Sequence, residues 1–166
     1  MFSEGEVFIY GSVGVCRIGE ICERSCGAEK REYYVLYPVY DDRSTLYIPT
    51  NSEALLSHLN PLLTKEAAEE LIAFVPEETP DWILNDKERA EEFRRILESG
   101  DRKAILFMLH VFYKRKKELF ACGKRLRSSD ESLMQRAEKL LCDELAFVLG
   151  LSSPEVEKQI RERGNY

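Results

Sequence analysis

The fold class is decided by the run Tyr33-Tyr34-Val35-Leu36-Tyr37 and by three similar runs around it. β-Branched and aromatic residues dominate these runs, and this composition favours strands over helices. Glycines and the Asp41-Asp42 pair separate them, and residues of this kind suit the tight turns of an antiparallel sheet. We therefore expect a small sheet or barrel in residues 1–60, with strands near residues 7–10, 13–18, 33–37 and 45–48.

After Pro61 the apolar residues change to the three- and four-residue spacing of amphipathic helices. A side chain that can cap a helix stands before each apolar stripe, and glycine or proline follows most of them. Asn85 with Glu88, and Ser128 with Glu131, have the spacing of a capping box. The expected helices begin after Thr64, Asn85, Asp101, Ser128 and Ser152, and the first four end near residues 74, 98, 123 and 150.

The two patterns predict an α+β protein. A small β barrel of SH3-like or Tudor-like size in residues 1–60 is followed by an all-α helical domain in residues 61–166. A length of 166 residues and a hydrophobic content of 44% suit one or two packed domains. No apolar run approaches the length of a membrane helix, and the N-terminus is acidic where a signal peptide would be basic. We therefore expect a cytoplasmic protein without membrane contact.

Residues suited to catalysis are scarce. His58 and His110 fall in different predicted domains and lack the spacing of metal ligands, so the sequence predicts neither an enzyme nor a cofactor. We expect His110, between apolar neighbours on a helix, to serve packing or to lie on the surface. The five cysteines include no Cys-x-x-Cys pair, which argues against a zinc ribbon. A redox or metal role for Cys16, Cys22 and Cys26 is the one enzymatic alternative.

Charge is distributed unevenly along the chain. The net charge of −6 argues against a protein that coats nucleic acid through bulk electrostatics. Residues 102–127, however, hold nine basic side chains and one acidic side chain. The run Lys114-Arg115-Lys116-Lys117 lies in this stretch and has two interpretations: a solvated helix end, or a contact with a phosphate backbone.

Aromatic residues supply the other candidates. Trp82 is the only tryptophan and stands in an acidic, proline-bearing connector just before a predicted helix. It can anchor the core, or it can serve as an apolar wedge or stacking platform for nucleic acid. The strand region holds six tyrosines, and strand alternation places some of them on the outer surface, where they are typical of a protein interface.

The order of these features resembles the CarD-type transcription regulators, over about residues 1–150. In the strand region the resemblance is carried by the opening residues 2–10, the Gly14-Val15 turn, residues 32–36 and the strand Leu46-Tyr47-Ile48-Pro49. Downstream it is carried by Trp82, Ser99-Gly100-Asp101, the basic helix and residues 138–146. A module similar to the first part also occurs as the polymerase-interacting domain of transcription-repair coupling factors.

The resemblance implies a transcription regulator without catalytic activity or cofactor. A Tudor-like barrel would bind the β subunit of bacterial RNA polymerase, and the helical domain would contact promoter DNA, weakly and without sequence specificity, at the upstream edge of the melted bubble. Trp82 would act as a minor-groove wedge that stabilises the open complex. The expected polymerase contacts are Arg24, Tyr47 and Tyr34, and the expected DNA contacts are Trp82, Lys87, Arg89, Lys114, Arg115 and Lys117.

The chain departs from the family pattern in both regions. Tyr47 stands where a second arginine is expected, which would make the polymerase contact partly aromatic. Ile83-Leu84-Asn85 follows Trp82 where many relatives have arginines, so the DNA contacts shift to Lys87, Arg89 and the run at 114–117. These departures and the net acidity leave a second hypothesis: an adaptor that binds polymerase or another protein without touching DNA. The sequence leaves the oligomeric state open.

Overall fold

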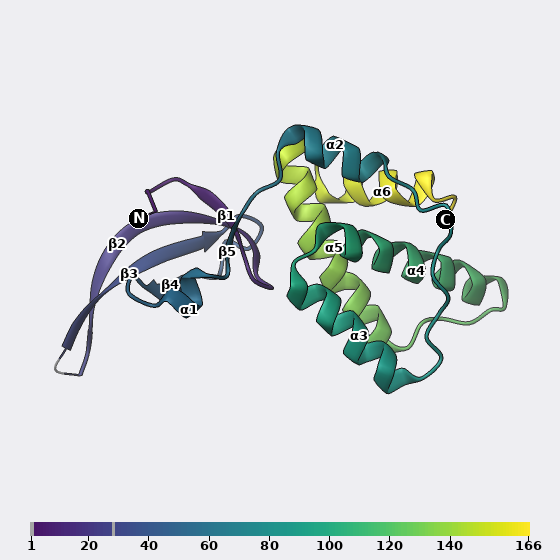
Figure 1. The fold of residues 1–166 in the computed structure, drawn as a ribbon, viewed down its shortest axis with the longest axis horizontal. Coiled ribbons are helices and arrows are strands. Elements are labelled where there is room, and N and C mark those ends of the chain that lie inside the picture. The colour runs from purple at the N-terminus through teal and green to yellow at the C-terminus, as the bar shows by residue number, and fades with distance from the viewer. Residues whose placement is uncertain (1, 28) are drawn as a thin grey trace. The chain divides into compact units, whose positions relative to one another are not determined.

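The computed structural model describes residues 2–27 and 29–166 (Figure 1). The chain divides into two compact units, residues 1–62 and residues 63–166. The first contains a five-stranded sheet and the second contains only helices, which confirms the predicted α+β class. None of the helices in the described ranges is long and apolar enough to cross a membrane.

The sheet is antiparallel throughout its described pairings, with strand order β4-β3-β2-β1-β5. The two long strands β2 and β3 form its centre, and a short helix, α1 (Glu53–Leu56), precedes the last strand. The sequence did not predict α1 or β5, because four- and three-residue elements are too short to show periodicity. The strands are β1 (Val7–Tyr10), β2 (Gly14–Cys26), β3 (Glu29–Pro38), β4 (Leu46–Pro49) and β5 (Leu59–Pro61).

Strand alternation gives the sheet two faces. The inner face carries a small core of buried side chains, and burial raises the pKa of the Cys16 thiol to about 11. Cys16 therefore acts as a small apolar residue. Cys22 is half-buried and free, and the side chain of Cys26 lies outside what the structure describes. The inner-face core consists of Cys16, Ile18, Tyr34, Leu36 and Ile48.

The helices begin largely where the caps predicted. Thr64, Asn85, Asp101 and Ser152 each accept a hydrogen bond from a backbone N–H in the first turn. Ser128 is the exception, because Arg127 occupies the N-cap position and provides no side-chain cap. The helices are α2 (Lys65–Ala73), α3 (Asp86–Ser99), α4 (Arg102–Ala121), α5 (Ser128–Leu149) and α6 (Ser153–Arg163).

The helical unit has the larger core, and α4 and α5 run through it (Figure 1). Leu109, Phe112 and Leu145 are completely buried between helices. His110 lies among them with 1% of its surface exposed, so it packs in the interior, and burial lowers its pKa. Four charged side chains, Arg89, Asp130, Asp143 and Glu144, are also buried in this unit. Buried charges need partners, and the partners of Arg89 connect the core to the Trp82 segment.

Candidate binding surfaces

The outer face of the sheet, opposite the inner core, carries an exposed cation and aromatic pair. The guanidinium carbon of Arg24 lies 3.5 Å from the centroid of the Tyr47 ring. Arg24 pairs with Arg31 across the β2–β3 ladder, and Tyr47 pairs with Val35 across the β3–β4 ladder. Residues 31 and 35 of β3 share one face because strand side chains alternate with a period of two. The stack holds Arg24 in place while its N–H groups remain available to a partner.

Other side chains on this outer face extend the same chemistry. Arg17 and Tyr37 are exposed and pair across the ladder. The β2 strand has an irregularity between Ile18 and Ile21, and a Cβ at Gly19 would collide with the Tyr37 ring, so this aromatic side chain lies directly over the backbone there. Arg31 pairs with Glu29 at 2.9 Å. The outer face is therefore basic and aromatic in a unit that is acidic as a whole, and it suits an acidic protein partner.

Tyr34 does not belong to this outer face. It lies on the inner face with 4% of its surface exposed, and its ring meets the Phe2 ring edge-on with centroids 5.7 Å apart. The expected role of Tyr34 as a direct surface contact therefore needs correction, because the ring belongs to the core. The sequence could not separate Tyr34 from Tyr33 and Tyr37, since a one-residue change of register exchanges the faces of a strand.

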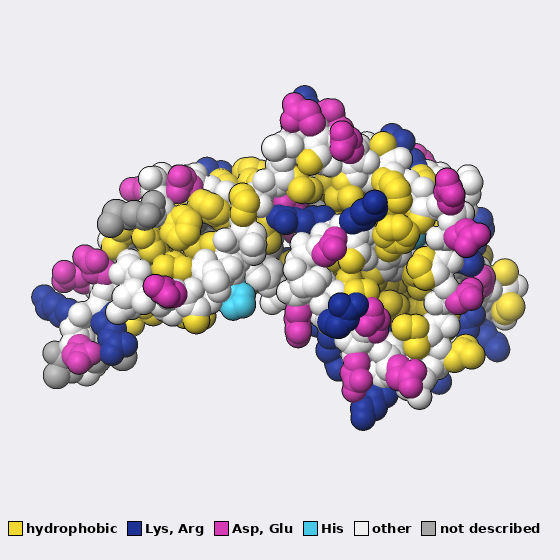
Figure 2. Space-filling view, viewed as in Figure 1, with side chains coloured by type: hydrophobic (Ala, Val, Ile, Leu, Met, Phe, Trp, Pro, Cys, Tyr) yellow, Lys and Arg dark blue, Asp and Glu magenta, His cyan; other side chains and the backbone are white. Residues whose placement is uncertain are grey.

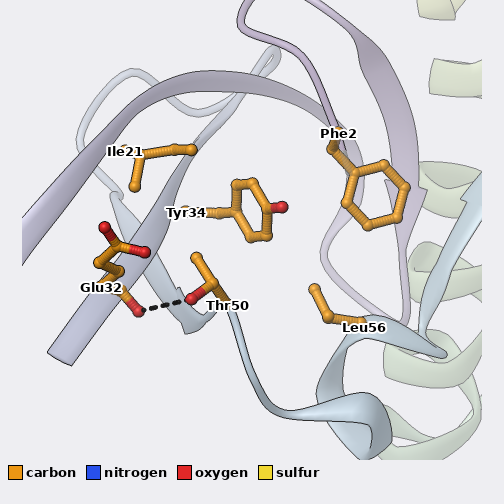
Figure 3. A pocket seen from close by; sticks show the side chains of 6 residues that line it. All are labelled: Phe2, Ile21, Glu32, Tyr34, Thr50 and Leu56. Atoms are coloured by element: carbon orange, nitrogen blue, oxygen red, sulfur yellow. Dashed lines mark hydrogen bonds between the residues drawn. The ribbon is translucent and has the colours of Figure 1, made fainter.

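Tyr34 does form part of a pocket of about 310 Å³ on the inner side of the sheet. Figure 3 shows its ring between Ile21 and Phe2. The backbone N–H of Thr50 donates to the backbone oxygen of Glu32 at 3.0 Å, which links two of the residues that line the pocket. The pocket is lined mostly by apolar groups, from Phe2, Ile21, Glu32, Tyr34, Thr50 and Leu56.

In the helical unit, Trp82 is partly buried against the aromatic core. Its ring centroid lies 5.6 Å from that of Phe112 and 6.2 Å from that of Phe93. Two guanidinium groups also approach the indole: the central carbon of Arg89 lies 4.6 Å from its centroid, and that of Arg115 lies 5.7 Å away. Trp82 is thus held by the bundle and contacts two cations, the buried Arg89 of α3 and the partly exposed Arg115 of α4.

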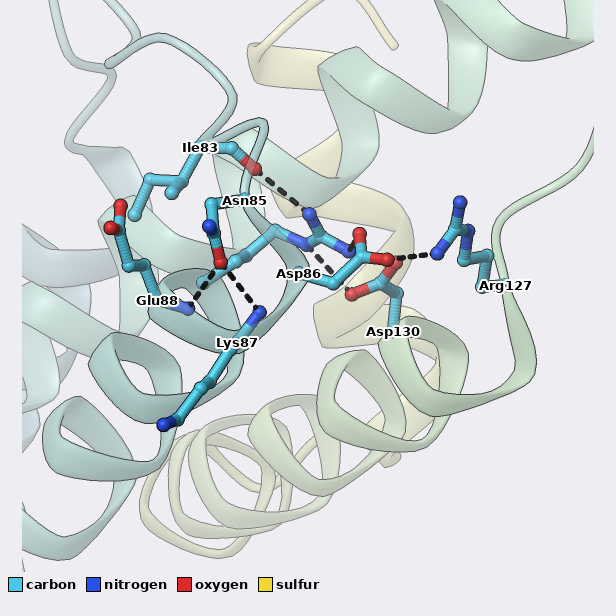
Figure 4. A network of polar contacts seen from close by, with 8 residues as sticks. Ile83, Asn85, Asp86, Lys87, Glu88, Arg127 and Asp130 are labelled. Carbon is cyan, nitrogen blue, oxygen red and sulfur yellow. Dashed lines mark hydrogen bonds and ion pairs between the residues drawn. The ribbon is translucent and has the colours of Figure 1, made fainter.

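Arg89 is the centre of a buried polar network (Figure 4). Its guanidinium donates to both carboxylate oxygens of Asp130, at 2.9 and 2.8 Å, and to the backbone oxygen of Ile83 at 2.8 Å. It also donates to Asp86 at 2.8 Å, and this hydrogen bond lowers the pKa of the Asp86 carboxyl. Arg127 pairs with the other oxygen of Asp86. The network fixes the segment after Trp82 to α3 and α5.

The expected DNA contact at Arg89 therefore needs correction. Only 3% of Arg89 is exposed, and its donors are used inside the protein. A buried, bidentate Arg–carboxylate pair of this kind positions structure and keeps the guanidinium away from a DNA phosphate. The sequence showed Asp86 three residues before Arg89 but gave no sign of Asp130, which is 41 residues away.

The other expected cations lie at the surface, most of them with partners. Lys87 is exposed and lies 4.0 Å from Glu91, Arg115 lies 3.4 Å from Glu118, and Lys117 donates to the backbone oxygen of Asn165. Lys114 is half-buried and makes no ion pair within the described residues. Figure 2 shows Lys and Arg side chains interspersed with Asp and Glu on the visible face of the helical unit.

Comparison with known proteins identifies the first unit. Residues 2–60 match the family model described as the CarD-like/TRCF RID domain. The N-terminal unit is similar to CarD-like domains. The resemblance inferred from the sequence is confirmed, and the CarD-like family is one of transcription factors with an RNA polymerase-interacting domain.

The similarity continues beyond the CarD-like domain. The chain is 26% identical over 164 residues, 99% of this chain and 100% of the relative, to the Bacillus subtilis (strain 168) protein named "Putative transcription factor YdeB". The aligned region therefore spans both units of this chain. The outer face with Arg24 and Tyr47 lies in the part that matches the CarD-like model, whereas Trp82 and the cations of α4 lie outside it.

Within the described ranges, no three His, Cys, Asp or Glu side chains lie close enough together to hold a metal ion. Arg17 also lies on the outer face, and the sequence alone did not predict this. Its place there follows from its pairing with Tyr37, which is known only from the strand register.

Proposed function

We propose that this protein is a transcription regulator that binds the β subunit of bacterial RNA polymerase through its CarD-like domain. Its helical unit contacts promoter DNA at the upstream edge of the bubble and so stabilises the open complex. The protein acts in the cytoplasm, where polymerase works. The observation that carries the proposal is the match of residues 2–60 to a polymerase-interacting domain whose outer face exposes the Arg24–Tyr47 stack.

The chemistry of the outer face supports an acidic partner surface on the polymerase. Arg24 is held on a rigid sheet, so little side-chain entropy is lost when it binds a carboxylate. Tyr47 is 38% exposed and Tyr37 is 43% exposed, and tyrosines of this kind supply apolar contact area at protein interfaces. Tyr34 supports this face indirectly, as part of the core beneath it.

On the DNA side, the contacts centre on Trp82 and Arg115, which lie together at the surface of the bundle. Lys87 and the α4 cations Lys114 and Lys117 supply further positive charge in the same unit. Each phosphate contact adds a salt-sensitive, sequence-independent increment of affinity, so this set gives weak binding. Attachment to polymerase raises the local concentration of the helical unit, and weak contacts then suffice.

A pull-down with isolated polymerase β fragments tests the proposal. Wild-type protein is expected to be retained, and Arg24→Glu is expected to reduce retention at least tenfold, because it places a carboxylate against an acidic surface. Arg43→Glu serves as a matched charge reversal, since Arg43 is exposed in the turn before β4 and outside the outer face. Equal retention of Arg24→Glu and wild type would contradict the proposed polymerase contact.

The adaptor without DNA contact is the second candidate function, favoured by the burial of Arg89 and by the ion pairs of the neighbouring cations. Binding to a forked promoter fragment, measured over a range of salt concentrations with and without polymerase, separates the two. A regulator that touches DNA loses affinity as salt rises, whereas an adaptor gives a flat response in both series.

A further inference from the structure

The C-terminal end of α4 leaves an aromatic ring in solvent. Phe120 is 82% exposed, although it lies on a helix whose preceding turns are packed into the core. The backbone carbonyl groups at this position are hydrogen-bonded. The N–H of Gly123 donates to the oxygen of Phe120 at 3.0 Å, and the N–H of Lys124 donates to the oxygen of Leu119 at 2.8 Å. These bonds and the positive φ of Gly123, 69°, end the helix without help from the ring.

The surroundings of Phe120 are basic. Lys116 and Lys117 precede it by four and three residues and therefore share its side of the helix. Lys124 and Arg125 follow directly after the turn, are exposed, and make no ion pair among the described residues. The acidic neighbours are already engaged, Glu118 by Arg115 and Glu131 by Lys116, each at 3.4 Å.

A comparison with Leu84 shows why the surroundings matter. Leu84 is 85% exposed, which makes it as accessible as Phe120, and a single exposed apolar residue needs no functional explanation. Leu84, however, has no π face and lies between the acidic residues Asp81 and Asp86. Of the two residues, Phe120 alone combines an aromatic face with flanking cations, and this combination is typical of surfaces that stack nucleic-acid bases while cations contact the phosphates.

We propose that Phe120 is a stacking platform for an unpaired nucleic-acid base, with Lys124 and Arg125 contacting the phosphates beside it. The inference rests on the proposed function only for its setting, since the edge of a melted bubble is where unpaired bases occur next to duplex. It places the platform on α4, separate from Trp82 in the connector. The ligand class is single-stranded DNA, recognised by stacking and charge without base-specific hydrogen bonds.

Binding of the full chain to a short, fluorescently labelled single-stranded oligonucleotide at low salt tests the platform. Phe120→Ala is expected to weaken binding on the order of tenfold, because it removes the aromatic face on which a base stacks. Phe120→Trp is expected to bind at least as well as wild type. Leu84→Ala is the matched control and is expected to bind as wild type, since it removes an equally exposed side chain that has no aromatic face on which a base can stack.

A second readout uses the single tryptophan. In a Trp82→Phe background, Phe120→Trp places the only indole at the platform, and stacking of a base is expected to quench its emission. Absence of wild-type binding, equal binding by Phe120→Ala and wild type, or unchanged indole emission would each overturn the platform. Preference for an acidic peptide over the oligonucleotide would overturn it too. None of these results depends on polymerase, so loss of the platform and loss of the proposed polymerase function are separate outcomes.

Discussion

The two units use the same kind of contact, an arginine guanidinium over an aromatic ring, in opposite ways. In the sheet, the Arg24 guanidinium lies over Tyr47, 3.5 Å from the ring centroid, and both side chains are exposed. In the helical unit, the Arg89 guanidinium lies over Trp82, 4.6 Å from the centroid, and Arg89 is buried. The difference is a carboxylate: Asp130 pairs with Arg89, whereas Arg24 has no ion pair among the described residues.

This contrast shows that a cation and an aromatic ring can form either an exposed binding surface or an internal contact that stabilises the fold. An exposed pair of this type contributes about 0.5–1 kcal/mol to stability and leaves donors for a partner. A buried pair whose cation is hydrogen-bonded to internal carboxylates does not present its donors to a partner. Removing one member of the ion pair leaves a buried charge unpaired, which is costly. Function is therefore expected at Arg24, and structural support for Trp82 is expected at Arg89.

The largest effect is expected from Asp130→Ala. This change leaves Arg89 buried without its bidentate partner and is expected to lower the free energy of unfolding by about 3–5 kcal/mol. Urea denaturation followed by circular dichroism and by Trp82 emission measures it, because Trp82 is the only tryptophan. A decrease of less than about 1 kcal/mol in the free energy of unfolding would show that the Arg89 network does not stabilise the helical unit.

Arg89→Lys sharpens the same point with a smaller change. Lysine keeps the positive charge but cannot reach Asp130, Asp86 and the Ile83 oxygen with one rigid fork, so about 1.5–3 kcal/mol of stability is expected to be lost. Trp82 emission is also expected to shift to longer wavelength as the indole loses its fixed position. Arg95→Lys is the matched control, because Arg95 pairs with Glu92 at the surface. Equal stability of Arg89→Lys and Arg95→Lys would contradict the contrast between buried and exposed arginines.

Burial in the helical unit also predicts a pH dependence. Because burial lowers the pKa of His110 in the folded protein below its ordinary 6.5, the unfolded chain binds the proton more readily. Stability is therefore lost as pH falls below about 6.5, at up to about 1.4 kcal/mol per pH unit. The expected result is a steeper loss in wild type than in His110→Gln. Burial raises the pKa values of Glu138 and Asp143, and these groups act in the opposite direction but equally in both proteins.

The smallest effect on stability is expected from Arg24→Ala. Removing one exposed cation from the Tyr47 ring is expected to change the free energy of unfolding by less than about 1 kcal/mol. Thermal melting of both proteins gives the difference. A destabilisation comparable to that of Asp130→Ala would mean that Arg24 supports the fold. The outer face of the sheet could then not be regarded as a free binding surface.

Sequence reasoning succeeded where the controlling interactions are local. Thr64, Asn85, Asp101 and Ser152 cap helices because a cap involves residues two or three positions apart. The α+β fold class was predicted correctly because the spacing of apolar residues changes after the strand region. Ser128 was wrong as a cap because the chain enters α5 one residue earlier than the capping-box pattern implied.

Sequence reasoning failed where partners are distant. Arg89 resembled a surface cation in a polar helix, and only the position of Asp130 on α5 turns it inward. Tyr34 resembled its neighbours, and only the pairing with Ile48 and Ile21 places it on the inner face. The exposure of Phe120 was not predicted from its position in the sequence, because exposure at a helix end depends on how α4 packs along its whole length.

The lifetime of the open promoter complex, measured by promoter dissociation after competitor addition, tests the division of labour between the two units most directly. Trp82→Ala is expected to shorten the lifetime while polymerase binding is retained, and Arg24→Glu is expected to shorten it by abolishing that binding. Leu141→Ala controls for lost stability, since Leu141 is buried away from both surfaces. An unchanged lifetime with Trp82→Ala, or an equal reduction with Leu141→Ala, would contradict the account.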